Sequence, residues 1–424
     1  MNYSRKEIKE GVTIHIINTN KFKTNLYAVF IATPLKKENV TKNALITSIL
    51  RRGSKNIPTQ DLISKKLEEM YGATFDCGIE KTGDNQIMKF YLETINEEFL
   101  PHKEELTKKC VDILFDIIFN PYIENDGFKE EYVETEKKNL KKIIESKIDN
   151  KKAYSFERCI EEMFKDEPYG LYKYGYLEDL ERVDSKELFS YYKELICNSK
   201  IDIFASGEMK DNSIIDIISE NPEIKKLNGR EADFIENSEK TSKTDVKPEK
   251  VVEEHMQVGQ GNLVLGLNIN TDKKNAKFII SMYNAILGGG ANSKLFQNVR
   301  EKESLAYIAG STYRRQKNVI FIRCGIEIDN YDKALKSIRK QLDDMKKGNF
   351  TEEDITNSKE LICESIRGIS SEQDSEITYY YGQELSDTFI SIKDYIDNIN
   401  SVTKEDIIEI ANEININTIY FLRD

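Results

Sequence analysis

The sequence predicts an α+β protein built from two homologous halves, each with an antiparallel-rich sheet packed against helices. The first observation is an internal repeat. When the chain is shifted along itself by about 237 positions, Asn25 falls on Asn262, and at a shift of 236 the segment 67–93 falls on 303–329. Strand, helix and hairpin patterns recur in the same order. A repeat that is half the chain indicates a domain duplication and not a solenoid of short units.

The second observation is a polar segment between the two copies. Residues 228–250 contain few large apolar side chains, so we interpret them as an interdomain linker. The predicted domains are an N-terminal half, residues 1–227, and a C-terminal half, residues 251–424. Each half has about 200 residues, which is enough to bury a core of its own.

Composition excludes several classes of function. The chain has 424 residues, and its 62 basic and 74 acidic side chains give a net charge of −12. This balance disfavours nucleic-acid binding, which needs a basic face. The longest apolar run, residues 26–32, has only a strand's length, so no membrane span is expected. The N-terminal residues 1–16 contain neither a long apolar core nor a small-residue cleavage site, so no signal peptide is expected. Six scattered cysteines without a C-x-x-C pair predict reduced thiols in a cytoplasmic protein.

Apolar periodicity and capping residues predict the order of elements in the first half. The expected elements are strands at 12–17 and 25–32, a helix at 41–51, a helix at 60–71 capped by Thr59, a hairpin at 73–95, helices at 102–119, 128–149, 153–165 and 185–195, and a strand at 201–207.

The second half repeats this plan. The expected elements are a strand at 262–270, a helix at 275–287, a glycine turn, a helix at 293–302, a hairpin at 305–328, a helix at 331–347, a helix capped by Thr351, a helix opened by Thr403 and Asp406 at capping-box spacing, and a strand at 417–424.

Two stretches carry a family resemblance. The segment 288–313 reads GGGANSKLFQNVREKESLAYIAGSTY, and residues 50–55 read LRRGSK. They resemble the C-terminal-half signature and the end of the N-terminal motif of the insulinase/pitrilysin family of inverzincin metalloproteases. The resemblance covers nearly the whole chain. It implies a clam-like chamber of which one such chain forms half.

The residues that would hold zinc in this family are absent. Active members carry His-x-x-Glu-His on a helix, where two imidazoles bind Zn²⁺ and the glutamate is the general base. The matching positions here are Ala44, Thr47 and Ser48. A methyl group and two hydroxyls cannot replace these ligands, so we expect no metal and no other cofactor.

The remaining candidate ligands are weak. The best match to the family's third ligand is Glu136, with Glu134 and Glu131 as competitors, and without the histidines we expect Glu136 to be a solvated helix charge. The histidines, His15, His102 and His255, are far apart in sequence. We expect His15 to face outward from its strand and His102 to lie on the surface.

By resemblance, Arg300 and Tyr307 match a pair that reaches across to the zinc site of the opposing half. A tyrosine hydroxyl can stabilise the negative charge that develops on a peptide carbonyl, and arginine offers a fork of donors. For the glycines Gly288, Gly289 and Gly290 two interpretations remain open: close approach of substrate backbone, or the end of a helix. The strand near 308–313 offers an edge to which a peptide can add.

Three functions follow as hypotheses. In the first, the chain is the non-catalytic subunit of a cytoplasmic two-chain zinc peptidase. Its partner is a homologous chain that carries the zinc motif, or alternatively a second copy of itself, and its substrate is a peptide. In the second, it is a peptide-binding or scaffold protein of the same fold without a role in hydrolysis. In the third, it is a hydrolase with a serine or cysteine nucleophile, which would need a histidine base.

Overall fold

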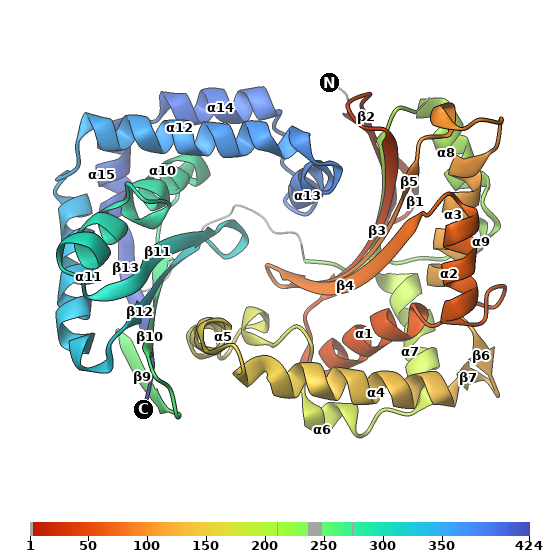
Figure 1. Ribbon diagram of the computed structural model, residues 1–424, viewed down its shortest axis with the longest axis horizontal. Coiled ribbons are helices and arrows are strands. Elements are labelled where there is room, and N and C mark those ends of the chain that lie inside the picture. Colours follow the sequence, from red (N-terminus) through yellow and green to blue (C-terminus); the bar gives the residue numbers. More distant parts are fainter. Residues whose placement is uncertain (1–2, 210, 236–247, 274) are drawn as a thin grey trace. The chain divides into compact units, whose positions relative to one another are not determined.

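The computed structural model describes residues 3–209, 211–235, 248–273 and 275–424, which form two compact units (Figure 1). Unit 1 consists of Met1–Ser146, Leu171–Glu236 and Gln373–Gly382, and unit 2 of Lys147–Gly170, Asn237–Glu372 and Gln383–Asp424. Of the predicted linker 228–250, residues 236–247 lie outside the described residues. The sequence boundaries 1–227 and 251–424 describe the repeat, whereas the two units interleave along the chain.

Unit 1 is built on a six-stranded sheet in which antiparallel pairing dominates. Only β2 and β8 pair in parallel; the other neighbours are antiparallel. The strand order is β1 (Tyr3–Lys9), β2 (Val12–Asn18), β8 (Lys200–Gly207), β3 (Thr24–Pro34), β5 (Asn85–Ile95) and β4 (Thr74–Thr82).

Unit 2 repeats this sheet. Its parallel pair, β9 and β13, corresponds to β2 and β8, and the following antiparallel strands correspond to β3, β5 and β4. The strand order is β9 (Lys250–His255), β13 (Ile414–Arg423), β10 (Gly261–Ile269), β12 (Val319–Ile326) and β11 (Ala306–Arg314). The predicted fold class, with two homologous antiparallel-rich halves, is therefore confirmed. The sequence analysis missed the edge strands β1 and β9.

Strand pairing corrects the register of the repeat within the second hairpin. Thr82 pairs with Asn85 across a turn of two residues, whereas Arg314 pairs with Val319 across a longer one that contains a short 3₁₀ segment, Arg315–Lys317. The extra turn residues mean that a uniform shift of 236 does not align the two hairpins strand for strand.

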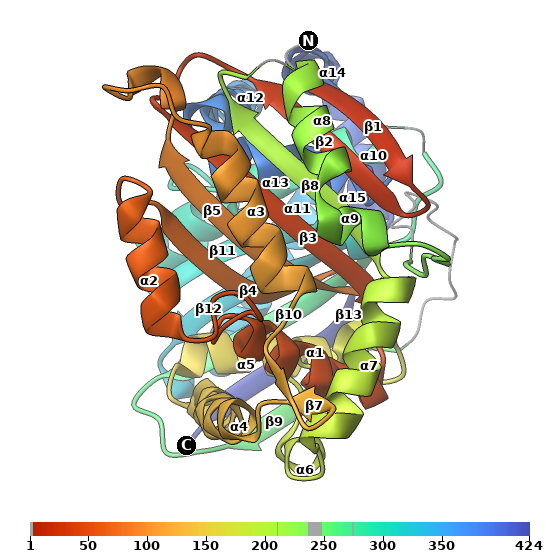
Figure 2. The same cartoon turned by 90° about the vertical axis from the view of Figure 1, so that its right-hand side faces the viewer.

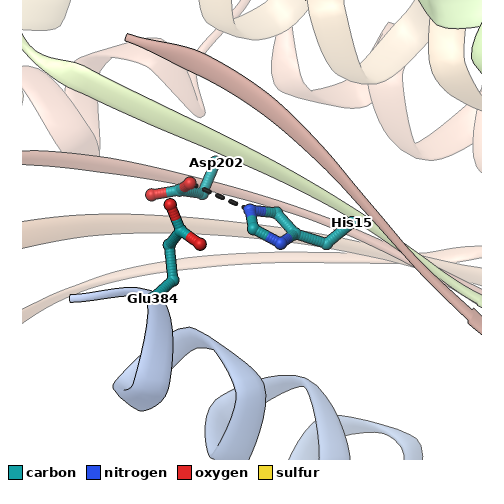
Figure 3. Close-up of side chains that lie close together, drawn as sticks. All are labelled: His15, Asp202 and Glu384. Carbon is teal, nitrogen blue, oxygen red and sulfur yellow. Dashed lines mark hydrogen bonds and ion pairs between the residues drawn. The ribbon is translucent and has the colours of Figure 1, made fainter. Parts of the chain in front are cut away.

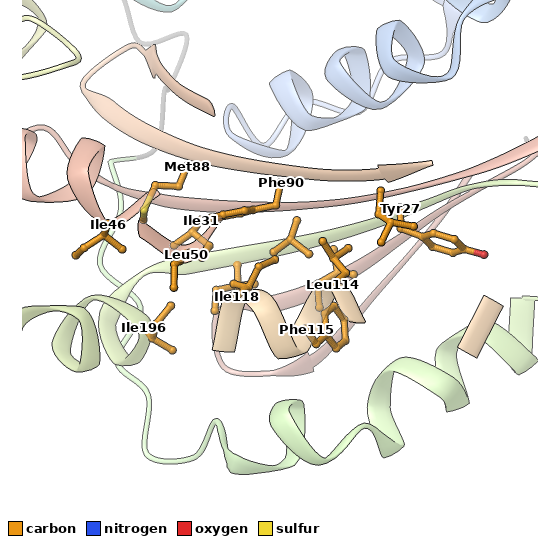
Figure 4. Close-up of a cluster of buried hydrophobic side chains, with 14 of the residues drawn as sticks. Tyr27, Ile31, Ile46, Leu50, Met88, Phe90, Leu114, Phe115, Ile118 and Ile196 are labelled. Atoms are coloured by element: carbon orange, nitrogen blue, oxygen red, sulfur yellow. The ribbon is translucent and has the colours of Figure 1, made fainter. Parts of the chain in front are cut away.

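Helices cover the sheet of unit 1 on one face, where they form the main core. Figure 2 shows α3, α8 and α9 lying across this face. Figure 4 shows sheet residues such as Ile31 and Phe90 packed against Leu50 of α1 and Phe115 of α3. The described helices of this unit are α1 (Lys37–Leu50), α2 (Gln60–Glu69), α3 (Leu106–Phe119), α4 (Glu130–Glu145), α6 (Leu177–Leu180), α7 (Ser185–Asn198), α8 (Asp211–Glu220) and α9 (Pro222–Lys226).

Several predicted caps form as expected. The Thr59 side chain accepts a hydrogen bond from the backbone N–H of Leu62 at the start of α2. Thr403 and Asp406 form a reciprocal capping box, in which aspartate replaces the usual glutamate. The helices of unit 2 outside the exchanged segment are α10 (Ala276–Gly288), the π-helical segment η4 (Leu295–Lys302), α11 (Tyr331–Lys346), α12 (Glu352–Gly368), α14 (Ile392–Ser401) and α15 (Lys404–Asn412). No helix among the described residues is both long enough and apolar enough for a membrane crossing.

The two sequence halves exchange a helix. Helix α5 (Lys151–Met163) comes from the first half but packs in unit 2. There the rings of Phe156 and Phe321 make a T-shaped contact with their centroids 5.1 Å apart. Helix α13 (Gln373–Glu384) comes from the second half, and its residues up to Gly382 pack in unit 1. There Tyr381 stacks on Phe30 with ring centroids 4.1 Å apart. Each unit therefore completes its core with a helix from the other half of the sequence.

Replacing Tyr381 by alanine should loosen unit 1 selectively. Removal of a buried aromatic side chain costs about 3–5 kcal/mol, and the lost ring covers Phe30 of β3. Amide hydrogen exchange followed by mass spectrometry should show faster exchange in β3 and β8, with a smaller effect from the half-buried Tyr379→Ala control. Unchanged protection of these strands would contradict the assignment of α13 to this core.

Candidate functional site

The three positions that the family resemblance assigns to the zinc motif lie together in the wall of one cavity in unit 1. Ala44, Thr47 and Ser48 lie on one face of α1, because positions i, i+3 and i+4 of a helix project the same way. The cavity has a volume of about 420 Å³ and also contains Arg51, Arg52, Gln60, Cys77, Gly78, Ile79, Glu136, Asn139, Leu140, Ile143 and Tyr174. The structure thus brings these positions next to Glu136 of α4.

The hydroxyls of this wall are already used within the helix. Thr47 Oγ1 donates to the carbonyl of Asn43 at 2.8 Å, and Ser48 Oγ donates to the carbonyl of Ala44 at 3.4 Å. Both side chains follow the local bonding pattern of serine and threonine in helices. They leave no strong ligand directed into the cavity.

The expectation that Glu136 is a solvated helix charge is wrong, because its exposed fraction is only 7%. The Arg52 guanidinium donates to its Oε1 through Nε and Nη2, and Asn139 Nδ2 lies 3.2 Å from both carboxylate oxygens. The competitors point elsewhere: Glu134 pairs with Lys137 at 3.0 Å, and Glu131 pairs with Lys129 at 2.9 Å. Burial of this carboxylate is possible because Arg52 neutralises its charge.

These residues do not fit a catalytic zinc ion. Such an ion takes three protein ligands, usually including histidine. Here a single carboxylate remains, and a guanidinium already occupies it. The chemistry of the donor set therefore excludes the family's metal-assisted hydrolysis at this cavity.

His15 lies far from this cavity in a buried polar network, which corrects the expectation that it faces outward. Its exposed fraction is 0%, because its imidazole is packed against the rings of Phe204 and Tyr3. Its Nε2 lies 2.9 Å from Asp202 Oδ1, and its Nδ1 lies 2.8 Å from the Tyr3 hydroxyl. Figure 3 shows the bond to Asp202 and also draws Glu384, the last residue of α13.

This network has a structural character. Lys200 Nζ lies 3.1 Å from both oxygens of Asp202, and the imidazole stacks on Phe204 with centroids 4.2 Å apart. Both ring nitrogens of His15 have partners, and an ammonium already neutralises the carboxylate. We therefore assign the network to packing of the sheet edge. His102, in contrast, is exposed as expected.

Arg300 and Tyr307 line a second cavity, which lies in unit 2 and has a volume of about 290 Å³. Arg300 belongs to the last turn of η4 and Tyr307 to the start of β11. The turn between them passes through Ser304, which has a φ of 52° in the left-handed region that non-glycine residues rarely adopt. The side chain of Arg300 is 40% exposed, and Tyr307 is 63% exposed.

The contacts of the pair hold it without burying its donors. Arg300 Cζ lies 4.3 Å from the centroid of the Phe296 ring, and its Nε lies 3.6 Å from Glu301 Oε1. The Tyr307 hydroxyl donates to Glu327 Oε1 at 3.3 Å. Sequence reasoning missed Glu327; the only signal for it was its place at the end of the strand that pairs with β11.

Glycines at the end of α10 are required by the packing of the chain itself. A Cβ at Gly288 would lie 2.5 Å from the backbone nitrogen of Ser311, and one at Gly289 would lie 2.7 Å from Ala285 Cα. Gly290 is less constrained, with its nearest neighbour, Leu361 Cδ2, at 3.4 Å. Close approach at Gly288 is therefore made by β11, and contact with substrate stays a prediction.

The thiol in the first cavity is not an available nucleophile. Cys77 Sγ donates to the carbonyl of Thr47 at 3.6 Å, and burial raises the pKa of this thiol to about 12. Burial also raises the pKa of Cys110 and of Cys324 to about 12. Since the thiolate is the nucleophile, these groups are protonated and unreactive at neutral pH. All six cysteines are free.

Replacing Arg52 alone should strongly lower the free energy of unfolding, whereas replacing both Arg52 and Glu136 should lower it much less. Arg52→Met leaves an uncompensated buried carboxylate, for which a loss of about 3–5 kcal/mol is expected. Arg52→Met combined with Glu136→Met should recover most of that loss in urea unfolding monitored at unit 1. Additive effects of the two substitutions would mean that the pair is not coupled.

Cys77 should react with iodoacetamide far more slowly than an unperturbed thiol. With a pKa of about 12, its thiolate fraction at pH 8 is roughly a thousandfold below that of a free cysteine. Peptide mapping after labelling should show this protection in the folded chain and its loss in urea. Equal rates in both conditions would contradict the burial of the thiol.

The chain is similar in sequence to known proteins. Residues 182–362 match the family model described as the Peptidase M16 inactive domain. The chain is 34% identical to the "Probable inactive metalloprotease YmfF" of Bacillus subtilis (strain 168), over 97% of this chain and 96% of that protein.

Solved structures show the same fold. A conserved protein from Enterococcus faecalis V583 superposes with a TM-score of 0.91 at 28% identity, covering 100% of this chain and 99% of that one. The periplasmic protease PqqL from Escherichia coli gives a TM-score of 0.72 at 12% identity, covering 99% of this chain but 47% of that one. The chain therefore belongs to the insulinase-type M16 peptidase family, and it lacks that family's His-x-x-Glu-His motif.

Proposed function

We propose that this chain is the non-catalytic subunit of a two-chain zinc peptidase, to which it contributes Arg300, Tyr307 and half of the peptide-binding chamber. The observation that carries the proposal is the contrast between the two cavities. In unit 1, Arg52 occupies the last carboxylate of the degenerate motif. In unit 2, the Arg300–Tyr307 pair remains exposed beside an open cavity.

The proposed role of Tyr307 is to stabilise the oxyanion that forms on the peptide carbonyl. Its hydroxyl makes a long hydrogen bond of 3.3 Å to Glu327, so redirection toward a substrate oxygen costs little. A donor aimed at the oxygen on which charge develops is most effective in a site that excludes water. An apposed subunit would provide that exclusion.

The proposed role of Arg300 is to hold the peptide. Stacking on Phe296 orients the guanidinium plane, and the 3.6 Å approach to Glu301 leaves most of its donors available for peptide carbonyls or a carboxylate. The exposed glycine Gly289 and its neighbours Gly288 and Gly290 lie in the same signature segment, and in this proposal they border the bound peptide.

The proposed partner is a homologous chain that carries His-x-x-Glu-His. The fold of this chain corresponds to about half of PqqL, so a single longer protein contains this fold together with a second segment of similar length. Two separate chains of this length would together supply the same two segments. A second copy of this chain is the alternative partner, but it would bring no zinc ligands. The six free thiols favour a cytoplasmic complex.

Peptide cleavage should appear only when this chain is mixed with a chain that carries the motif and zinc. Tyr307→Phe or Arg300→Ala should then lower kcat by about 10²-fold, the scale of one oxyanion donor. The matched controls are Tyr71→Phe, an exposed tyrosine that also bonds a glutamate, and Arg339→Ala, whose side chain is 43% exposed. Both should leave the rate unchanged.

If the mixed complex cleaves peptide at the same rate with both site residues replaced, the roles of Arg300 and Tyr307 are wrong. In that case the peptide-binding or scaffold function becomes the better reading, because it needs the fold without the donors.

A further inference from the structure

Two arginines of unit 2 lie against the same aromatic ring. Arg314 ends β11 and Arg323 lies within β12, and their Cζ atoms are 5.5 Å and 5.2 Å from the centroid of Phe156 on α5. Both arginines are exposed, whereas Phe156 is buried. The ring therefore lies beside two guanidiniums that remain accessible at the surface, and guanidinium donors favour a planar anionic partner.

Neither of these two charges has an ion-pair partner in the part of the chain that the structure describes. Among the described residues, no carboxylate lies within 4.0 Å of Arg314 or Arg323. Other arginines of this unit do have such a partner: Arg158, Arg300, Arg339, Arg367 and Arg423. In a protein with 74 acidic and 62 basic side chains, an unpaired pair of arginines is a local exception.

The local surroundings add to the need for an anion. Arg323 Nη2 donates to Thr312 Oγ1 at 3.3 Å, and this neutral hydroxyl does not balance the charge. Partial desolvation of its guanidinium, and to a lesser extent the neighbouring Arg314, lower the pKa of Arg323, although the residue as a whole is exposed. A bound anion would relieve both effects because it pairs with the desolvated cation.

We propose that Arg314, Arg323 and Thr312 form a binding site for a carboxylate of a peptide, either an aspartate or glutamate side chain or the chain terminus. A carboxylate matches the fork of guanidinium donors and can pair with it in a bidentate manner. The site selects acidic peptides. This inference rests on the proposed function only in that the ligand is taken to be a peptide.

The test measures peptide binding by the isolated chain, without zinc or a second subunit, so its outcome is independent of cleavage by a mixed complex. Fluorescence anisotropy compares a Glu-rich peptide with an amidated terminus, the matched Gln peptide with an amidated terminus, and the Gln peptide with a free carboxylate. The proteins are the wild type, the R314Q/R323Q variant and the control R339Q. Circular dichroism checks that each variant is folded.

We expect the Glu-rich peptide to bind at least about tenfold more weakly to R314Q/R323Q than to the wild type, the scale of one charge-assisted hydrogen bond. Binding to R339Q should be unchanged, and added salt should weaken binding to the wild type. If the free-terminus peptide shows the same loss, the terminal carboxylate is the ligand. Equal binding of all three peptides to the wild type, or no loss of binding in a folded double variant, overturns the proposal.

Discussion

The ion pair between Arg52 and the buried carboxylate of Glu136 is the constraint on which the character of the first cavity depends. A carboxylate with an exposed fraction of 7% needs a cation beside it, and here the chain supplies that cation itself. With Thr47 and Ser48 bonded back to their own helix, the cavity is complete without an ion. The cavity thus combines an absence of zinc ligands at the matched positions with an internal counter-charge for its one buried carboxylate.

The second unit has the opposite electrostatic character. Its donors lie at the surface and remain only partly used, since Arg300 stacks on an aromatic ring with one distant carboxylate and Tyr307 makes a single long hydrogen bond. Arg314 and Arg323 extend this pattern along the same hairpin. The donors of the second unit thus lie at the surface, where the peptide-binding role that we propose would use them.

The exchange of α5 and α13 explains why the two copies act as one chain. The sheet residues Phe30 and Phe321 are each covered by a ring from the other copy, Tyr381 and Phe156 respectively. A cut at the polar segment 228–250 would leave each fragment without a helix that covers its sheet. Duplication in sequence therefore does not give two independent folding units, and the stability of either half depends on the whole chain.

The duplication, the fold class and most helices and strands could be predicted from the amino-acid sequence, because they depend on local periodicity and on caps such as Thr59 and Thr403. The absence of the zinc motif could also be read from it, because that depends only on residue identity at fixed spacing. Which side chains are buried, and which distant residues they pair with, became clear only from the tertiary structure. His15 was expected to point outward, but a strand with neighbours on both edges and covered faces has no solvent side. Glu136 was expected in water, but its partner lies 84 residues away in sequence. Sequence spacing cannot report such pairings, since the fold brings together charges that are distant along the chain.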